Sequence, residues 1–313
     1  MKPLLPFPTP VTPEFDSGKL PSRIRVFSDL VYAAGTPDQS LDLYLPDCAS
    51  EPVPLVVYFH EGAFAFGSKR DRPLEYVLPL LDRGFALAAV DYRKSDVSTW
   101  PGLIYDAKAA IRFLRSRAAE FRLDADRFAA WGISAGGYIA SMLGVTGKIS
   151  AFEDPAMGNE GVSSEVQLVI DWYGCCGGFQ YLDQQVIENR NGNANHHHAN
   201  SPESIMLGSA LSDIPELCRL ASPYAFVHRD MPPFLIQHGK ADAIVPVQQS
   251  LTFAAAIERV AGKEKVKLLL YNKGHQGNSL TDDPQPYQDA FEFLDKAFMR
   301  PYKFISPEVL DGN

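Results

Sequence analysis

Cysteine is scarce in this chain of 313 residues, which contains only Cys48, Cys175, Cys176 and Cys218. Their spacing fits no zinc-binding pattern, and two of them are adjacent. A chain of this length buries enough surface on folding to form a large core without disulfides or a structural metal. We therefore expect free thiols that pack as small apolar side chains, and no metal or other cofactor.

Basic residues are outnumbered, with 29 Lys and Arg against 38 Asp and Glu, so the formal charge is −9. Binding to nucleic acid requires an excess of Lys and Arg on at least one face, so we expect no such partner. We expect no membrane insertion either, because no apolar run approaches the roughly 18 residues that span a bilayer. Residues 1–13 hold five prolines and show no secretory leader. This predicts a cytoplasmic protein, or a secreted one if the sequence lacks its natural start.

Short apolar stretches alternate with longer amphipathic ones, which is typical of a mostly parallel sheet with helices on both faces. Several short stretches are apolar at both odd and even positions, as strands buried on both faces must be. The predicted strands are Arg23–Ala33 and Leu41–Leu45, an antiparallel pair, followed by Leu55–His60, Phe85–Tyr92, Arg127–Ile133, Val166–Tyr173, Phe234–His238 and Val266–Tyr271. The predicted helices are Tyr76–Arg83, Leu103–Glu120, Ala135–Val145, Gln248–Val260 and Tyr287–Phe298.

Two segments interrupt this alternation and predict the domain organisation. Residues 1–20 form a proline-rich N-terminal segment, and residues 21–313 form a single α/β domain. Residues 175–232 are rich in Gly, Asn, His and Ser, so we expect a small cap inserted between two strands. Three consecutive histidines, 196–198, predict a solvated loop of this cap rather than a metal site, because an extended backbone sends successive side chains to opposite faces.

The strand Arg127–Ile133 runs directly into the motif Gly132-Ile133-Ser134-Ala135-Gly136 and then into a helical pattern. G-x-S-x-G between a strand and a helix is typical of a sharp turn that lifts a nucleophilic serine hydroxyl above the sheet. The small residues on either side are needed because the strand and helix backbones approach closely there. Ser134 is therefore the candidate nucleophile.

Three further segments follow the ends of predicted strands: 60–64 with Gly62 and Ala63, 238–242 with Asp242, and 273–277 with His275. A serine hydroxyl becomes a good nucleophile when an imidazole accepts its proton, and a carboxylate holds that imidazole in the required tautomer. The glycine-containing loop can supply backbone N–H donors to an oxyanion. Because all of these segments end at one edge of a parallel sheet, we expect them to meet there.

Asp171, at another strand end, is an alternative triad acid, although its surrounding sequence is a poorer match than that of Asp242. The aromatic residues Phe64, Trp172 and Tyr173 also lie at or just past carboxyl strand ends, where open α/β sheets bind ligands. We expect them to line the substrate-binding site, with core packing as the alternative for each.

At this point the sequence resembles the α/β-hydrolases, and among them the small carboxylesterases similar to hormone-sensitive lipase and to feruloyl and acetyl-xylan esterases. The resemblance extends from residue 41 to residue 275. It rests on the following stretches: Leu41–Pro46, Val90–Arg93, Tyr105–Ala110, Asp126-Arg127, Trp131–Gly137, Pro232–Gly239 and Val245-Pro246.

The resemblance implies that Ser134 is the nucleophile, Asp242 the acid and His275 the base of a catalytic triad. It also implies that Gly62, Ala63 and Ala135 supply the oxyanion-hole N–H groups. One residue departs from the family pattern, since Glu61 stands where the family usually has a second glycine after histidine. Glu61 therefore either changes the backbone angle of this loop or places a carboxylate near the site.

The sequence thus predicts a metal-free serine hydrolase that cleaves small carboxylic esters through an acyl-enzyme. Short-chain, aromatic and acetylated-sugar esters are the expected substrates. Arylformamidase or peptidase activity on the same triad is the alternative, and a non-catalytic ligand-binding protein on the same fold is a further one. The sequence leaves the oligomeric state open, with a homodimer as one option.

Overall fold

The computed structural model describes residues 15, 20, 23–46, 51–275 and 278–298. Its strands form one sheet of eight in the order β1-β2-β4-β3-β5-β6-β7-β8. Pairing of β1 with β2 and of β2 with β4 is antiparallel, and all other pairs are parallel. The strands are β1 (Ile24–Val31), β2 (Ser40–Pro46), β3 (Val53–Phe59), β4 (Ala86–Val90), β5 (Leu123–Ile133), β6 (Leu168–Trp172), β7 (Phe234–Gly239) and β8 (Val266–Tyr271).

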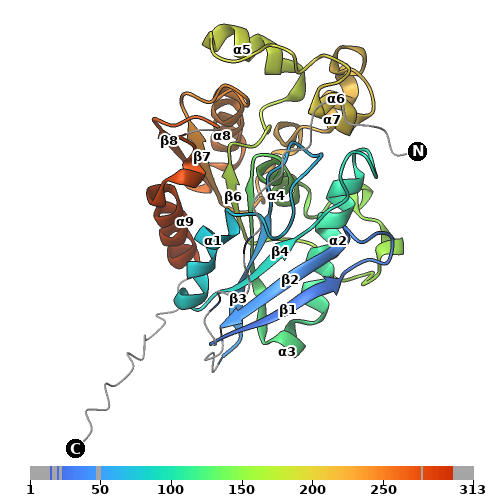
Figure 1. Cartoon of the computed structure of the whole chain (residues 1–313), viewed down its shortest axis with the longest axis vertical. Helices are drawn as coiled ribbons and strands as arrows, with labels where there is room; N and C mark the ends of the chain where they lie inside the picture. The colour runs from blue at the N-terminus through green and yellow to red at the C-terminus, as the bar shows by residue number, and fades with distance from the viewer. Residues whose placement is uncertain (1–14, 16–19, 21–22, 47–50, 276–277, 299–313) are drawn as a thin grey trace, which may run out of the picture.

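Helices cover both faces of this sheet, as Figure 1 shows. One core layer packs the sheet against α2 (Gly102–Ser116), α4 (Ala135–Thr146) and α8 (Gln248–Ala261). The other packs it against α1 (Leu74–Val77) and α9 (Pro284–Ala297). Successive side chains of β3 point to opposite faces of the sheet. Odd-numbered residues pack in the first layer and even-numbered ones in the second: Leu55, Val57 and Phe59 against Val56 and Tyr58. The predicted α/β fold with a mostly parallel sheet is confirmed.

Two of the predicted helices differ from those in the structure. The stretch predicted at Tyr76–Arg83 is the short helix α1 followed by a 3₁₀-helix at Leu78–Arg83. Pro79 accounts for the change, because it has no N–H to donate to the preceding turn. The stretch predicted at Leu103–Glu120 divides at Arg117 into α2 and α3 (Ala118–Phe121).

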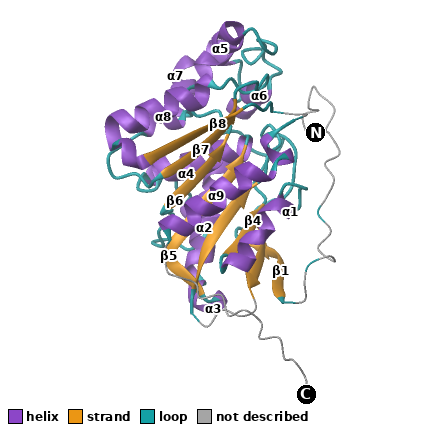
Figure 2. Cartoon of the chain, turned by 90° about the vertical axis from the view of Figure 1, so that its left-hand side faces the viewer, coloured by secondary structure: helices purple, strands orange, loops and turns teal. Residues whose placement is uncertain are grey.

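The segment between β6 and β7, for which a cap is predicted, holds α5 (Leu182–Asn189), α6 (Pro202–Leu207) and α7 (Pro215–Leu220). In both ribbon views these helices lie at the same end of the molecule, beyond β6 and β7 (Figures 1 and 2). The proline-rich segment predicted at residues 1–20 lies outside the described residues except for Phe15 and Leu20, and so does Cys48.

Candidate active site

Ser134 occupies the turn between β5 and α4 and is only partly buried. Its backbone is strained for a residue with a side chain, at φ 54° and ψ −114°. Such conformations cost about 1–3 kcal/mol and persist where their surroundings hold them. Here a Cβ on Gly132 would overlap the Gly136 carbonyl, and one on Gly136 would overlap the Phe59 carbonyl. Only glycines therefore allow β5, α4 and the end of β3 to approach closely enough to form this turn.

His275 and Asp242 complete a chain of polar contacts that begins at Ser134. The Ser134 hydroxyl lies 3.1 Å from His275 Nε2, and His275 Nδ1 lies 2.8 Å from Asp242 Oδ2. Asp242 Oδ1 accepts hydrogen bonds from the N–H groups of Ile244 and Val245 at 2.9 and 2.8 Å. Because Asp242 can only accept, His275 carries its proton on Nδ1 and leaves Nε2 free to accept from serine. The structure therefore brings together the three residues predicted as a triad.

The charges of this pair shift both pKa values. Burial disfavours ionisation of the Asp242 carboxyl, but His275 and His238 outweigh burial and hold its pKa well below the usual range. Burial likewise opposes protonation of His275, yet the adjacent Asp242 carboxylate raises the pKa of the imidazole overall. Asp242 is thus an anion that stabilises the protonated form of His275.

His238 is a contact of Asp242 that the sequence did not reveal. It is fully buried at the end of β7, with Nε2 2.9 Å from the Val245 carbonyl and 3.3 Å from Asp242 Oδ2. Its Nδ1 lies 2.6 Å from the Ser250 hydroxyl. Since the Val245 carbonyl only accepts, Nε2 carries a proton. This N–H also lies close to Asp242 Oδ2 and stabilises the carboxylate. The His-Gly pair before Asp242 was the available signal, but sequence alone does not show which way its side chain points.

The predicted oxyanion residues lie at the end of β3 and the start of α4. Gly62, Ala63 and Phe64 all have positive φ, at 130°, 48° and 63°. The close approach of Gly136 to the Phe59 and His60 carbonyls places the start of this loop against the first turn of α4, which begins at Ala135. The loop and Ser134 are therefore neighbours.

Glu61 is not among the residues with positive φ, unlike the three residues that follow it. Burial raises the pKa of its carboxyl, while the charge of His275 lowers it. The same interaction contributes to the raised pKa of His275. Glu61 therefore places a carboxyl group close enough to the site to act on His275, as one of the two predictions for this residue stated.

Asp171, the alternative acid, does not contact His275. Its side chain is fully buried and accepts hydrogen bonds from the Gly174 N–H at 2.9 Å and the Cys176 thiol at 3.2 Å. Burial raises the pKa of this carboxyl. Asp171 therefore closes the turn after β6 rather than orienting the imidazole.

The three aromatic residues predicted to line the site have different positions. Tyr173 packs edge-on to the His275 ring, with centroids 4.7 Å apart, and Phe64 packs edge-on to Tyr138 at 5.5 Å. Trp172 is fully buried in the core layer of α9, which also includes Tyr173, and its Nε1 donates to Gln237. Its side chain points to the face of β6 opposite Asp171. These contacts of Trp172 agree with the core-packing alternative.

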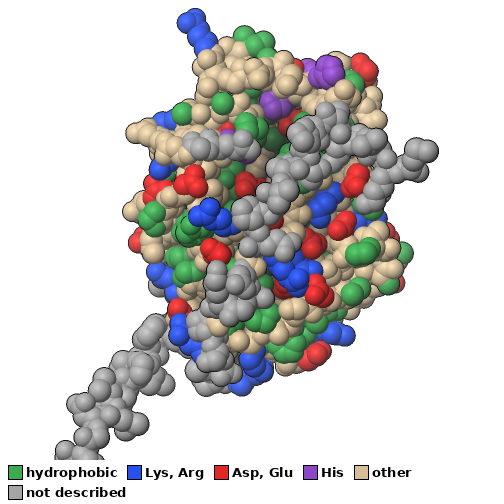
Figure 3. Space-filling view, in the orientation of Figure 1, with side chains coloured by type: hydrophobic (Ala, Val, Ile, Leu, Met, Phe, Trp, Pro, Cys, Tyr) green, Lys and Arg blue, Asp and Glu red, His purple; other side chains and the backbone are tan. Residues whose placement is uncertain are grey.

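One of the three consecutive histidines differs from the predicted solvated loop. His196 is buried rather than solvated, and its Nδ1 lies 3.1 Å from Glu203 Oε1. His197 is partly exposed and His198 exposed; histidine side chains are visible at the upper end of the molecule in Figure 3. Among the residues that the structure describes, no group of three metal-ligating side chains forms a site. Cys175, Cys176 and Cys218 are buried free thiols, as predicted.

Within the described ranges, every helix is too short or too polar to cross a bilayer.

The α/β-hydrolases share this arrangement: a mostly parallel sheet, a serine on a strand–helix turn such as β5–α4, and a histidine that links the serine to an aspartate past a later strand. Comparison with known proteins assigns the chain more closely. A family model described as BD-FAE matches residues 41–257, which is more than half of the chain. The protein belongs to the BD-FAE family.

Relatives of this chain include proteins named as esterases. The chain is 30% identical over 259 residues to esterase LipQ of Mycobacterium tuberculosis, covering 81% of this chain and 57% of LipQ. It is 28% identical to isoprenylcysteine alpha-carbonyl methylesterase ICME of Arabidopsis thaliana, covering 79% of this chain and 56% of that protein. The chain thus spans a little over half the length of these curated relatives.

Solved structures give the same fold. A truncated carbohydrate esterase from gut microbiota superposes with a TM-score of 0.78 at 25% identity, covering 91% of this chain and 99% of that one. A Thermogutta terrifontis esterase superposes with a TM-score of 0.65 at 23% identity, covering 88% and 94%. The predicted membership of the α/β-hydrolases is confirmed.

Proposed function

We propose that this protein hydrolyses carboxylic esters through a covalent acyl-enzyme on Ser134. The observation that carries the proposal is the continuous contact from the Ser134 hydroxyl through His275 to Asp242. It is supported by the left-handed loop 62–64 beside the serine and by the named esterases among the relatives. Those relatives give no support to the amidase, peptidase or binding-only alternatives.

In the proposed acylation step, Ser134 Oγ attacks the ester carbonyl carbon while its proton passes to His275 Nε2. The carbonyl oxygen becomes an oxyanion, to which the N–H groups of Gly62, Ala63 and Ala135 would donate. The C–O bond to the alcohol then breaks, and the alcohol leaves with the proton from His275. A water molecule, deprotonated by the same imidazole, attacks the acyl-enzyme and releases the carboxylic acid and free Ser134.

The substrates that we propose are small: short-chain, aromatic or acetylated-sugar esters. The carbohydrate esterase among the structural neighbours supports sugar esters. Two buried aromatic contacts, Phe64 on Tyr138 and Tyr173 on His275, occupy space around the serine and favour short acyl groups. A screen of p-nitrophenyl, acetyl-sugar and feruloyl esters tests the ester class directly. The cytoplasmic location and the homodimer stay predictions.

We expect kcat/KM to peak between acetyl and butyryl p-nitrophenyl esters and to fall by octanoyl. An open apolar groove would gain about 0.8 kcal/mol for each added CH₂, whereas a closed pocket loses affinity because overpacking costs about 1–3 kcal/mol. The measurement is kcat/KM across one series with a constant leaving group. An optimum at ten carbons or longer would contradict the small-ester proposal and leave the triad unaffected.

The activity should fall at low pH with a midpoint above 6.5, the ordinary imidazole pKa. His275 must be neutral to accept the serine proton, and although burial alone would lower its pKa, the Asp242 carboxylate raises it. As pH falls through this raised value, the imidazole becomes protonated and activity is lost. The check is the pH profile of kcat/KM for a substrate that does not titrate in this range. A midpoint below that of free imidazole would show that burial outweighs the carboxylate.

A further inference from the structure

The loop 60–69 that follows β3 is held in an unfavourable backbone conformation. Two of its residues with side chains, Ala63 and Phe64, lie in the left-handed region directly after Gly62. Residues with side chains stay in this region only where the surrounding structure holds them there. Inside the loop, the Gly62 carbonyl accepts from the Ala65 and Phe66 N–H groups. These bonds close the turn but do not attach it to the rest of the protein.

One short segment that follows β4, residues 91–95, bonds to the loop at three places. At the start of the loop, the Tyr92 hydroxyl donates to the His60 carbonyl at 3.0 Å, and its ring stacks on the His60 ring with centroids 4.4 Å apart. In the middle, the Phe64 carbonyl accepts from both the N–H and the hydroxyl of Ser95, at 2.9 and 3.0 Å. At the far end, the Lys69 N–H donates to Asp91 Oδ1 at 2.8 Å.

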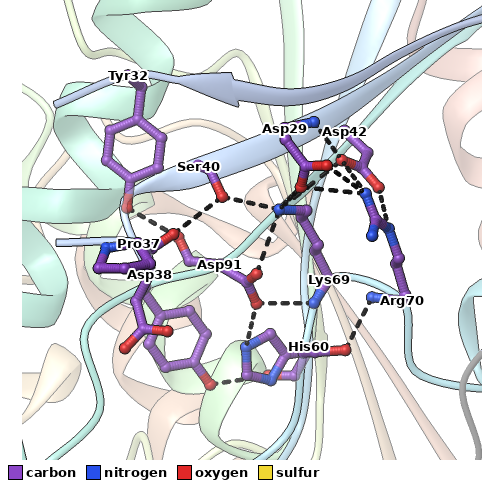
Figure 4. A network of polar contacts seen from close by, with 12 residues as sticks. Asp29, Tyr32, Pro37, Asp38, Ser40, Asp42, His60, Lys69, Arg70 and Asp91 are labelled. Atoms are coloured by element: carbon purple, nitrogen blue, oxygen red, sulfur yellow. Dashed lines mark hydrogen bonds and ion pairs between the residues drawn. The ribbon is translucent and has the colours of Figure 1, made fainter. Parts of the chain in front are cut away.

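Asp91 is itself fixed by a partly buried network of charges, which Figure 4 shows. The buried Lys69 ammonium lies 2.8 Å from Asp29, 3.5 Å from Asp91 Oδ2 and 2.7 Å from the Ser40 hydroxyl. Because Lys69 contributes both its N–H and its ammonium to this network, the end of the loop cannot move without breaking contacts with β1 and β2. The antiparallel strands β1 and β2 thus hold the far end of the loop in place.

The neutral side chain of His60 forms a hydrogen bond within the loop. Burial and the charge of Lys94 lower its pKa to about 3, despite a hydrogen bond to the Glu61 carbonyl that acts in the opposite direction. Since that carbonyl only accepts, His60 Nδ1 carries the proton and donates to it at 2.5 Å. The ring therefore lies between Tyr92 and the backbone of its own loop.

We propose that Tyr92 and Ser95 are positioning residues for catalysis, because they hold the 62–64 backbone where its N–H groups can reach an oxyanion. Neither touches the reacting atoms; they act through the His60 and Phe64 carbonyls. The inference rests on the proposed function, in which Gly62 and Ala63 stabilise the transition state. Donors that must be placed accurately lose most of their effect when displaced by about 1 Å, on the order of 10²-fold.

The test uses Ser95→Ala and Tyr92→Phe in the full chain, each of which removes one hydroxyl. We expect kcat for p-nitrophenyl acetate to fall about tenfold in each, since each variant loosens the loop without removing an oxyanion donor. KM should stay within about twofold of the wild-type value, because the hydrogen bonds from the loop N–H groups to the substrate oxygen strengthen only in the transition state. Ser98→Ala is the matched control, since among the described residues the Ser98 hydroxyl donates to the neighbouring Thr99 carbonyl and not to the loop.

Four further measurements distinguish a positioning role from a general loss of structure. The pH midpoint of kcat/KM should not move in either variant, because His275 and Asp242 keep their contacts. Inactivation by paraoxon, whose phosphoryl oxygen would use the same N–H donors, should slow by about the same factor as kcat, on the order of tenfold. Ser95→Thr, which keeps the hydroxyl, should recover most of the rate. Thermal unfolding identifies a variant that does not fold. In that case the kcat of the other variant, Ser95→Ala or Tyr92→Phe, tests the inference.

Wild-type kcat in folded Ser95→Ala and Tyr92→Phe would overturn the inference while the Ser134 mechanism stands. A shifted pH midpoint would also overturn it, because the loss would then act through His275. If Ser134→Ala is as active as the unaltered protein, the proposed function fails, and this inference fails with it. The Ser134 variant thus separates the two failures.

Discussion

Replacing Ser134 by alanine should lower kcat for ester hydrolysis by on the order of 10⁶ and leave the protein folded. The change removes the only atom to which the acyl group is transferred in the proposed mechanism. His275 and Asp242 would remain in place, but a water molecule would have to replace a nucleophile already held 3.1 Å from the base. The fold should tolerate the loss, since Ser134 is partly exposed and its hydroxyl has no bond to the core.

The measurement is kcat for p-nitrophenyl acetate at saturating substrate, with folding checked by thermal unfolding. Ser98→Ala is a suitable control, as it removes a serine hydroxyl outside the site. An organophosphate should also form one covalent adduct on the peptide that contains Ser134, which mass spectrometry detects. Comparable turnover by the folded Ser134 variant would refute the assignment of the nucleophile.

Replacing Asp242 by asparagine should lower kcat by roughly 10⁴, as in other triads. The Ile244 and Val245 N–H groups would keep an oxygen to bond, so the side chain should keep its orientation. The amide nitrogen would then face His275 Nδ1, and two donors cannot bond to each other. The imidazole would place its proton on Nε2 instead, where it could no longer accept one from Ser134. Its pKa should fall as well, because the carboxylate is lost.

Asp171→Asn is the matched control for this change. Asp171 is also a buried aspartate, near the end of the neighbouring strand β6, but its contacts are the Gly174 N–H and the Cys176 thiol. We expect this variant to keep most of the wild-type kcat, and asparagine can still accept from Gly174. If Asp171→Asn proved the costlier variant, the assignment of the acid would have to be reversed.

The predictions from sequence succeeded where chemistry depends on a local pattern. Glycines at 132 and 136 around Ser134 are required by the close approach of three backbone segments, and any strand–turn–helix of this kind needs them. Placing Asp242 and His275 after strands was enough to predict that they meet, because parallel strands end at one edge. The same reasoning does not show whether Trp172 faces the substrate or the core, since the face to which a strand-end side chain points depends on register; in the structure Trp172 packs in the core layer of α9.

The sequence by itself determined the α/β architecture and the candidate triad, because apolar periodicity and short motifs are local properties of the chain. Only the tertiary structure showed that Asp242, and not Asp171, contacts His275, since this contact joins residues that are 33 positions apart. It also showed the support that His238 gives to the acid and that residues 91–95 give to the loop after β3. These contacts join segments separated in sequence, and their formation depends on how strands pair and on which way each buried side chain points.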